Sequence, residues 1–383
     1  MKRVTILGST GSIGLQALDV AGRHADRLRV TALAAGRNLE ALCRQAARWQ
    51  PEVVALEWAA DIEAARAALA EAAPRARVLV GPGSAAVVAA EAPCETVLNG
   101  IVGAAGLVPS LAALGQGRRV ALANKETLVI GGPLVREALR RGGDLVPVDS
   151  EHSAALQCLA GHRPEEVARL TLTASGGPLR QHPRWWAATR EEVLTHPVWD
   201  MGPRITVDSA LLFNKGLELI EAHWLFDLAW SQLDAVIHPQ ARVHALVEFV
   251  DGSVVAQAAP ADMRLPIQLA FSWPERWPDA AIERLLRPLA DLEFAPIEPG
   301  RFPAFDLAVR AGRDGGTAPC ALNAADEVAV SAFLEGAIAL GQVPEVMARV
   351  LDAHRVEGVE SLVQLQRVDA WARDEARSQA VRA

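Results

Sequence analysis

The chain has 383 residues, of which 51% are hydrophobic and 22% charged, and this globular composition argues against disordered, collagen-like and coiled-coil proteins. A single hydrophobic core rarely organises more than about 300 residues, so we expect two or three domains. The formal net charge of −8 would repel a phosphate backbone, so nucleic acid is not expected as a partner.

Cysteine spacing and hydropathy limit the cellular setting. The four cysteines are scattered without a CxxC pair, so the sequence predicts neither a zinc site nor a disulfide framework, and a reducing cytoplasm is expected. The apolar run before Gly8 is too short for a signal peptide, whose apolar core needs about 7 to 15 residues. No window approaches about 18 apolar residues, so no membrane span is predicted.

Residues 1–149 alternate short β-branched runs with helical stretches, which predicts a parallel sheet in an N-terminal Rossmann-like domain. The first strand leads into GSTGSIG at residues 8–14 and then into a helix. Small residues let a backbone approach a pyrophosphate, whose charge then rests on the helix N-terminus. This context predicts dinucleotide binding, with a simple tight turn as the alternative. The predicted strands are residues 4–7, 30–34, 53–56, 78–80, 97–101, 120–123 and 145–148.

The second predicted strand leads into Gly36-Arg37-Asn38. An NAD-specific site usually places an acidic residue here for the ribose hydroxyls. Arg37 instead offers a cation to a 2′-phosphate, which favours NADP over NAD. A solvated surface arginine is the alternative.

Lysine is rare in this sequence. Of the 38 basic residues only three are lysines, and the two internal ones, Lys125 and Lys215, each follow an asparagine. Lysine differs from arginine in being a compact, titratable point charge, which suits an active site. Two lysines that persist by chance are the alternative interpretation.

Three acidic residues suggest a metal site. Asp149 and Glu151 follow the last predicted parallel strand, and strand alternation is expected to place both on one side, where they suit Mg²⁺ or Mn²⁺. In a later helix, Asn214 and Lys215 share a face with Glu218, which would complete a three-carboxylate site. A solvated strand end and an exposed Lys–Glu pair are the alternatives.

The stretch at residues 175–203 is rich in glycine and tryptophan, and a stretch of that length inside a compact chain is usually functional. Its SGGP segment at 175–178 is a candidate anion-binding turn. The segment HPVWDMG at 196–202 resembles a hydrophobic flap over a bound ligand, with core anchoring as the alternative.

The rest of the chain predicts a central α+β domain at 150–290, a linker at 291–302 rich in proline, and a C-terminal helical domain at 303–383. A helix capped by Asp208 or Ser209 should follow the glycine-rich stretch. Strands are predicted at residues 170–173, 236–237, 243–250 and 254–258, the last two joined by a hairpin turn at Asp-Gly. The predicted C-terminal helices cover residues 305–311, 323–335 and 343–354.

Together these motifs resemble the 1-deoxy-D-xylulose 5-phosphate reductoisomerase family, the NADPH- and metal-dependent enzymes of non-mevalonate isoprenoid biosynthesis. The resemblance covers nearly the whole chain, and implies a cytoplasmic homodimer that converts a small phosphorylated sugar into 2-C-methyl-D-erythritol 4-phosphate. Besides the motifs above, it rests on ANKE at 123–126, VDSEHSA at 148–154, VDSALLFNKGLELIEAHWLF at 207–226, PADMRLPI at 260–267 and GGTAPCALNAADEVAV at 315–330.

The resemblance also implies residue roles. Asp149, Glu151 and Glu218 would be catalytic ligands of Mg²⁺, Mn²⁺ or Co²⁺, with Lys125 as a further catalytic residue. The residues implied to touch NADPH are Thr10, Gly11, Ser12, Ile13, Gly36, Arg37, Asn38, Asn124, Glu126 and Gly202. The residues implied to hold the substrate, with Trp199 in the flap, are Lys125, Ser150, Glu151, Ser175, His196, Trp199, Ser209, Asn214, Lys215 and Glu218.

One residue departs from the family pattern, because Ala245 stands where many members have a serine near the substrate phosphate. This puts one peripheral contact in doubt. Two other functions remain open at this point: a different NADP-dependent dehydrogenase of a phosphorylated sugar, and a catalytically silent NADP-binding sensor.

Overall fold

The computed structural model describes residues 1–199, 201–284 and 292–382, so Asp200 of the predicted flap lies outside the described residues. The chain forms two compact units. The first contains residues 1–127, 135–149 and 262–282, and the second contains residues 128–134 and 150–261 and the described residues from 283 onward. The predicted segments 1–149, 150–290, 291–302 and 303–383 stay predictions.

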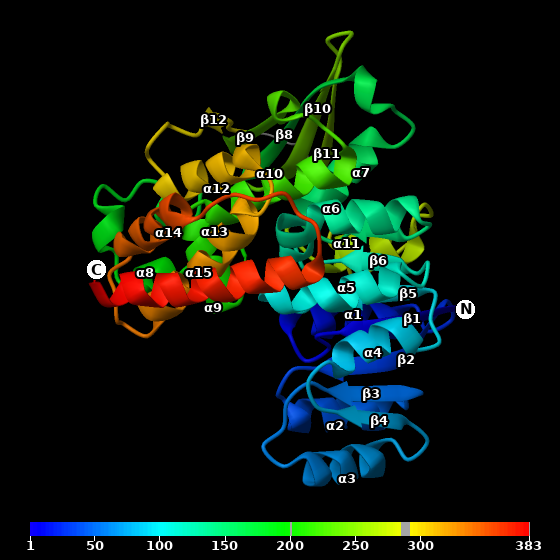
Figure 1. The fold of residues 1–383 in the computed structure, drawn as a ribbon. Helices are drawn as coiled ribbons and strands as arrows, with labels where there is room; N and C mark the ends of the chain where they lie inside the picture. The colour runs from blue at the N-terminus through cyan, green and yellow to red at the C-terminus, as the bar shows by residue number, and fades with distance from the viewer. Residues whose placement is uncertain (200, 285–291, 383) are drawn as a thin grey trace. The chain divides into compact units, whose positions relative to one another are not determined.

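The first unit is built on a seven-stranded sheet in which all neighbouring strands run parallel, as predicted for a Rossmann-like domain (Figure 1). The sheet order is β4-β3-β2-β1-β5-β6-β7, so the order reverses between β1 and β5. Open α/β sheets bind ligands at such a switch point, beyond the carboxyl ends of the strands. The strands are β1 (Lys2–Leu7), β2 (Leu28–Ala35), β3 (Val53–Leu56), β4 (Arg77–Val80), β5 (Thr96–Asn99), β6 (Arg119–Leu122) and β7 (Asp144–Pro147).

Helices between the strands belong to the same unit, and the buried apolar runs of β1, β2 and β3 are typical of a parallel sheet covered on both faces. A later segment also packs here, since Lys2 Nζ donates to the Phe271 carbonyl at 3.2 Å and His24 Nε2 lies 2.8 Å from Gln268 Oε1. The helices are α1 (Ser12–Arg23), α2 (Leu39–Trp49), α3 (Ile62–Ala72), α4 (Ser84–Glu91), η1 (Gly103–Gly106), α5 (Leu107–Leu114), α6 (Glu126–Arg140), which continues into the second unit, and α11 (Arg264–Ser272).

The second unit contains a five-stranded mixed sheet with the order β11-β10-β8-β9-β12. The predicted hairpin is confirmed, because Gly252 has φ +85° and Asp251 Oδ1 accepts from Ser253 N at 2.9 Å between β10 and β11. The short strand β12 pairs with β9, although its composition predicted a linker. The strands are β8 (Val167–Ala174), β9 (Leu233–Ile237), β10 (Val243–Phe249), β11 (Val254–Ala258) and β12 (Ala295–Pro296).

The helix predicted to begin at Asp208 or Ser209 is two helices in the structure. Both residues lie inside α9, and α10 begins after Leu212, whose φ of +54° breaks the helical path. The N-cap prediction is therefore wrong, because apolar periodicity continues through the break and conceals it. The helices around this sheet are α7 (Ser150–Leu159), η2 (Pro164–Glu166), η3 (Trp185–Ala187), α8 (Arg190–Val193), α9 (Pro203–Ala210), α10 (Phe213–Phe226) and η4 (Trp230–Gln232).

The C-terminal part is helical, as predicted, and its helices appear from orange to red in Figure 1. The central helix α13 buries most of its side chains, including Leu322 and Phe333, against its neighbours. No helix in the described ranges is long and apolar enough to cross a membrane. The helices are α12 (Pro303–Asp314), α13 (Ala318–Leu334), α14 (Gln342–Ala353) and α15 (Leu362–Arg382).

Candidate active site

The glycine-rich turn brings α1 close to the ends of β1 and β5. Gly8 has φ +75°, and a Cβ there would lie 2.6 Å from the Gly100 carbonyl oxygen. A Cβ on Gly14 would lie 2.3 Å from the Gly8 carbonyl oxygen, so neither position tolerates a side chain. No side chain caps α1 at Gly11, and Gly11 and Ser12 are exposed. The free N–H groups of this helix end can therefore receive an anion.

The segment after β2 contains Gly36, Arg37 and Asn38, which are all exposed. Asn38 caps α2, because its Oδ1 accepts from Ala41 N at 3.0 Å. The Arg37 guanidinium lies over the Trp58 ring, 4.9 Å from its centroid. Sequence reasoning missed Trp58, which follows a different strand.

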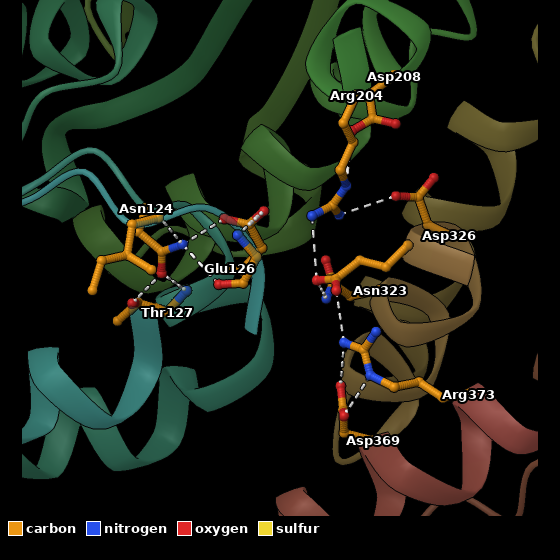
Figure 2. A network of polar contacts seen from close by, with 12 residues as sticks. Asn124, Glu126, Thr127, Arg204, Asp208, Asn323, Asp326, Asp369 and Arg373 are labelled. Atoms are coloured by element: carbon orange, nitrogen blue, oxygen red, sulfur yellow. Dashed lines mark hydrogen bonds and ion pairs between the residues drawn. The ribbon is translucent and has the colours of Figure 1, made fainter. Parts of the chain in front are cut away.

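Asn124 and Glu126 are buried in a polar network at the carboxyl end of β6 (Figure 2). Asn124 Nδ2 donates to the Ile101 and Gly103 carbonyls, both at 2.9 Å, and to Glu126 Oε2 at 2.8 Å. Its Oδ1 accepts from Thr127 N at 3.0 Å. These bonds hold the loop after β5 in place. Contact of Asn124 and Glu126 with a cofactor stays a prediction.

The three predicted metal ligands come close together. Each of Asp149, Glu151 and Glu218 offers a carboxylate oxygen, and these oxygens lie within 4.8 Å of one another. The reason given for Asp149 and Glu151 is wrong, because β7 ends at Pro147 and Glu151 lies in the first turn of α7. The closeness of these two acids therefore comes from a short strand-to-helix connection and not from strand alternation.

Lysine ammonium groups compensate these carboxylates. Lys125 Nζ lies 3.1 Å from Asp149 Oδ2. Lys215 Nζ contacts Glu218 and lies 3.7 Å from Glu151 Oε1. Burial by itself raises the pKa of Glu151, but the Lys215 charge and His244 hold that pKa well below its usual value. Glu151 is therefore ionised and able to bind a cation at neutral pH.

The donor set fits a hard divalent cation. Three carboxylates face two ammonium groups, so one negative charge remains for a cation to neutralise. Oxygen donors without thiolates are the ligands that Mg²⁺ and Mn²⁺ prefer. Asn214 Nδ2 donates to Glu218 Oε1 at 2.5 Å, and Ser150 Oγ donates to Glu151 Oε2 at 2.6 Å. These bonds orient two of the carboxylates.

His152 on α7 contacts α10 at two buried positions. His152 Nε2 donates to the Glu218 carbonyl at 2.9 Å, and its Nδ1 lies 3.1 Å from Glu221 Oε2. Because a carbonyl can only accept, the His152 ring carries a proton on Nε2. Neither His152 nor Glu221 was predicted as a site residue, although both lie within the family motifs.

The SGGP turn and the predicted flap meet at Ser175. Ser175 Oγ lies 3.2 Å from His196 Nε2 and accepts from Gly177 N at 3.2 Å. His196 Nδ1 accepts from Trp199 N at 2.9 Å, and burial lowers the His196 pKa, so the ring is neutral with its proton on Nε2. Ser175 Oγ thus accepts from both neighbours, which leaves its own hydroxyl proton available to donate. A Cβ on Gly177 would lie 2.6 Å from the Ser209 carbonyl, which places Ser209 beside this turn.

The structure also shows the surroundings of Trp199 in the flap and of Ala245, which departs from the family pattern. Trp199 is half-buried, with its ring centroid 6.4 Å from that of His244. Ala245 is fully buried in the apolar core of the second unit, and the effect of its missing hydroxyl on phosphate binding stays a prediction. Alternation along β10 instead directs His244 toward Glu151, at 3.7 Å. Gly202 is the exposed N-cap of α9, and its contact with NADPH stays a prediction.

A buried ionic network in the second unit was not predicted (Figure 2). Arg204 on α9 lies 3.1 Å from Asp326 and 3.2 Å from Glu327, both on α13. Arg373 on α15 lies 2.7 Å from both Glu327 and Asp369. Burial and the charge of nearby Asp208 raise the pKa of Asp326 well above its usual value. The helix that follows the flap is thus bound to the C-terminal helices.

Comparisons with known proteins agree along the whole chain. The model of the 1-deoxy-D-xylulose 5-phosphate reductoisomerase family matches residues 4–132, and models of two of its C-terminal domains match residues 145–226 and 258–375. Relatives with that name come from Anaeromyxobacter dehalogenans and Thermus thermophilus. They are 50% and 51% identical, over 98% of this chain and over 96% and 99% of theirs.

Solved structures agree with these matches. A 1-deoxy-D-xylulose 5-phosphate reductoisomerase from Zymomonas mobilis in complex with NADPH is 36% identical, with a TM-score of 0.91 over 99% of both chains. A DOX-P reductoisomerase in complex with NADPH, fosmidomycin and magnesium is 35% identical, with a TM-score of 0.94 over 99% of this chain and 98% of its own.

Proposed function

The chain belongs to the 1-deoxy-D-xylulose 5-phosphate reductoisomerase family, and we infer that it converts this substrate into 2-C-methyl-D-erythritol 4-phosphate with NADPH and a divalent metal ion. It is therefore an NADP-dependent oxidoreductase of non-mevalonate isoprenoid biosynthesis. The observation that carries this function beyond family membership is the cluster of three carboxylates compensated by Lys125 and Lys215.

We propose that Asp149, Glu151 and Glu218 hold the metal ion. Solved structures of relatives contain magnesium. When bound, the ion polarises a carbonyl as a Lewis acid, the chemistry that an isomerisation of a hydroxyketone requires. Lys125, held 3.1 Å from Asp149, presents an ammonium that stabilises negative charge developing on a substrate oxygen. Lys215 keeps Glu151 ionised and so keeps it able to bind the cation.

The substrate phosphate is assigned to the turn around Ser175. The Ser175 hydroxyl has its proton free to donate, since its oxygen already accepts from Gly177 and His196. Ser209 lies beside this turn, and Asn214 and Lys215 lie on the next helix. Binding energy from a remote phosphate is available to orient the reacting carbons. Trp199 would cover them and exclude water.

NADPH is assigned to the first unit. The exposed, uncapped end of α1 at Gly11 and Ser12 receives the pyrophosphate, with Thr10 and Ile13 beside it. Arg37 receives the 2′-phosphate, flanked by Gly36 and Asn38. Asn124 and Glu126 of this unit complete the set, and Gly202 of the second unit is a further proposed contact.

Two further proposals concern the oligomeric state and the location of the chain. We propose that the chain forms a homodimer and acts in the cytoplasm. Light scattering coupled to size-exclusion chromatography measures the first, and a mass of one chain at micromolar concentration would contradict it. Fractionation of the native cells measures the second.

The other candidate functions are disfavoured by the match of three family models over most of the chain. The decisive test measures NADPH oxidation with 1-deoxy-D-xylulose 5-phosphate and Mn²⁺, and identifies the product by mass spectrometry. Substrate-dependent oxidation that yields 2-C-methyl-D-erythritol 4-phosphate is expected. Reduction of the substrate without rearrangement would indicate an ordinary sugar-phosphate dehydrogenase, and no oxidation would indicate a sensor.

A further inference from the structure

Arg37 and Trp58 stand at neighbouring strand ends in the first unit. Arg37 follows β2 and Trp58 follows β3, and Trp58 N donates to the Gly36 carbonyl at 2.9 Å, so the parallel pairing continues past both strands. The guanidinium lies 4.9 Å from the indole centroid. Trp58 is 49% exposed, so the pair lies on the surface beyond the carboxyl edge of the sheet.

The contact with Trp58 leaves the Arg37 guanidinium able to bind an anion. A guanidinium held over an aromatic face keeps its N–H groups available as donors, whereas in an ion pair they donate to a carboxylate. Across the described residues, no carboxylate pairs with Arg37. Exposed arginines elsewhere in this unit do pair, at 3.1, 3.0 and 2.6 Å, as in Arg3–Glu95, Arg29–Glu52 and Arg77–Glu91.

The acidic residues near this pair are engaged elsewhere. Glu40 pairs with Arg44 on the same helix. Glu57, which precedes Trp58, caps α4 by accepting from Gly83 N and Ala85 N, the latter at 3.0 Å. Asp61 caps α3 by accepting from Ala64 N at 3.0 Å. None of these contacts involves Arg37, whose guanidinium is exposed to solvent at this edge.

We propose that Trp58 is a positioning residue for cofactor selection, which holds the Arg37 guanidinium at the end of β2 with its donors directed to the 2′-phosphate of NADPH. This inference rests on the proposed NADPH function and adds to it a residue from a neighbouring strand. Without the indole, the arginine side chain samples many rotamers. Binding of the phosphate then restricts it to one rotamer, which costs conformational entropy. The effect should therefore appear for NADPH and not for NADH.

Calorimetric titration of NADPH and NADH into the full-length protein tests this, using Trp58→Ala, Trp58→Phe, Arg37→Ala and the double variant. Trp58→Ala should raise the NADPH Kd about two- to fivefold, the range of an exposed cation–π contact, and leave the NADH Kd unchanged. Trp58→Phe should recover most of the loss, and Trp58→Ala should add little once Arg37 is removed. Trp371→Ala, an exposed tryptophan on α15, is the matched control.

Each other outcome overturns a definite part of the reasoning. An equal loss for both cofactors would make Trp58 a general structural or adenine contact, and no loss would make the stacking irrelevant. If Arg37→Ala changes the NADPH-to-NADH ratio and Trp58→Ala does not, only the positioning role fails. If Arg37→Ala leaves that ratio unchanged, the 2′-phosphate assignment itself fails. Substrate turnover, measured separately, reports on the overall function.

Discussion

Glu218→Gln removes one of three clustered carboxylates with almost no change of volume. Glu218 is 1% exposed, accepts from Asn214 at 2.5 Å and contacts the Lys215 ammonium. The introduced amide can still accept from Asn214, but its NH₂ group would face the ammonium, so two donors would meet. Metal binding loses a charged ligand, and folding loses a buried ion pair.

The magnitudes follow from these contacts. Loss of a residue that only supports a metal ligand costs about 10- to 100-fold in affinity, so loss of a direct ligand should cost about 100-fold or more, or about 2.7 kcal/mol. Breaking a buried pair costs about 3 to 5 kcal/mol of folding free energy. Lys215 keeps Glu151 at 3.7 Å, so we expect the lower end of that range.

Titration calorimetry with Mn²⁺ and with NADPH, together with urea unfolding, measures these effects. Glu221→Gln is the matched control, because Glu221 is equally buried on α10 but contacts His152 and not the carboxylate cluster. The control should lose stability and keep Mn²⁺ affinity. A folded Glu218→Gln variant that binds Mn²⁺ normally would refute the metal assignment, and a large loss of NADPH affinity would mean that Glu218 is misplaced.

Four other predictions concern the metal, the cofactor, the flap and the ionic network. Exhaustive chelation should abolish turnover and Mn²⁺ should restore it; full activity after chelation would exclude a metal role. Arg37→Ala should reduce the NADPH-over-NADH ratio of kcat/KM by about one to two decades, the size of a charge-assisted bond, and equal values in the unmodified protein would contradict the assignment. Trp199→Ala should lower kcat/KM for the substrate far more than it lowers stability, whereas a core tryptophan would cost about 3 to 5 kcal/mol of stability. Because the pKa of Asp326 is raised in the folded chain, its stabilising contribution is complete below the unfolded pKa of about 3.9 and is lost as pH rises through the folded value. Asp326→Asn should therefore flatten this decline in the free energy of unfolding, and an unchanged pH profile would show that Asp326 does not titrate there.

Local patterns predicted the first sheet well, because its buried parallel strands form short apolar runs separated by helices. They failed where the same sequence pattern is compatible with two different local structures. Apolar residues continue from α9 through Leu211 and Leu212 into α10, so the break at Leu212 left no trace in the periodicity. Strand alternation was expected to place Asp149 and Glu151 on one side, but the chain enters α7 at Ser150, so alternation does not apply to Glu151.

Local sequence patterns could not predict contacts between segments that are far apart in the chain. Arg204 and Asp326 are 122 residues apart in the chain, and nothing near either residue signals the other. Gly132 illustrates the same limit: a Cβ there would lie 2.4 Å from the indole of Trp224, which is far away in the sequence. Trp58 looked like an ordinary surface residue until the pairing of β2 with β3 placed it over Arg37.

The scarcity of lysine acquires a physical explanation at Lys215. Its ammonium contacts Glu218 and lies 3.7 Å from Glu151, in a position that is 4% exposed. An arginine fork binds both oxygens of one carboxylate and would withhold them from a cation. A single ammonium point charge stabilises both acids and leaves oxygen atoms for a metal, and the same holds for Lys125 beside Asp149. Even Lys2 is engaged, since its Nζ donates to the Phe271 carbonyl at 3.2 Å. A sequence that uses arginine almost everywhere thus retains lysine where the smaller cation is required.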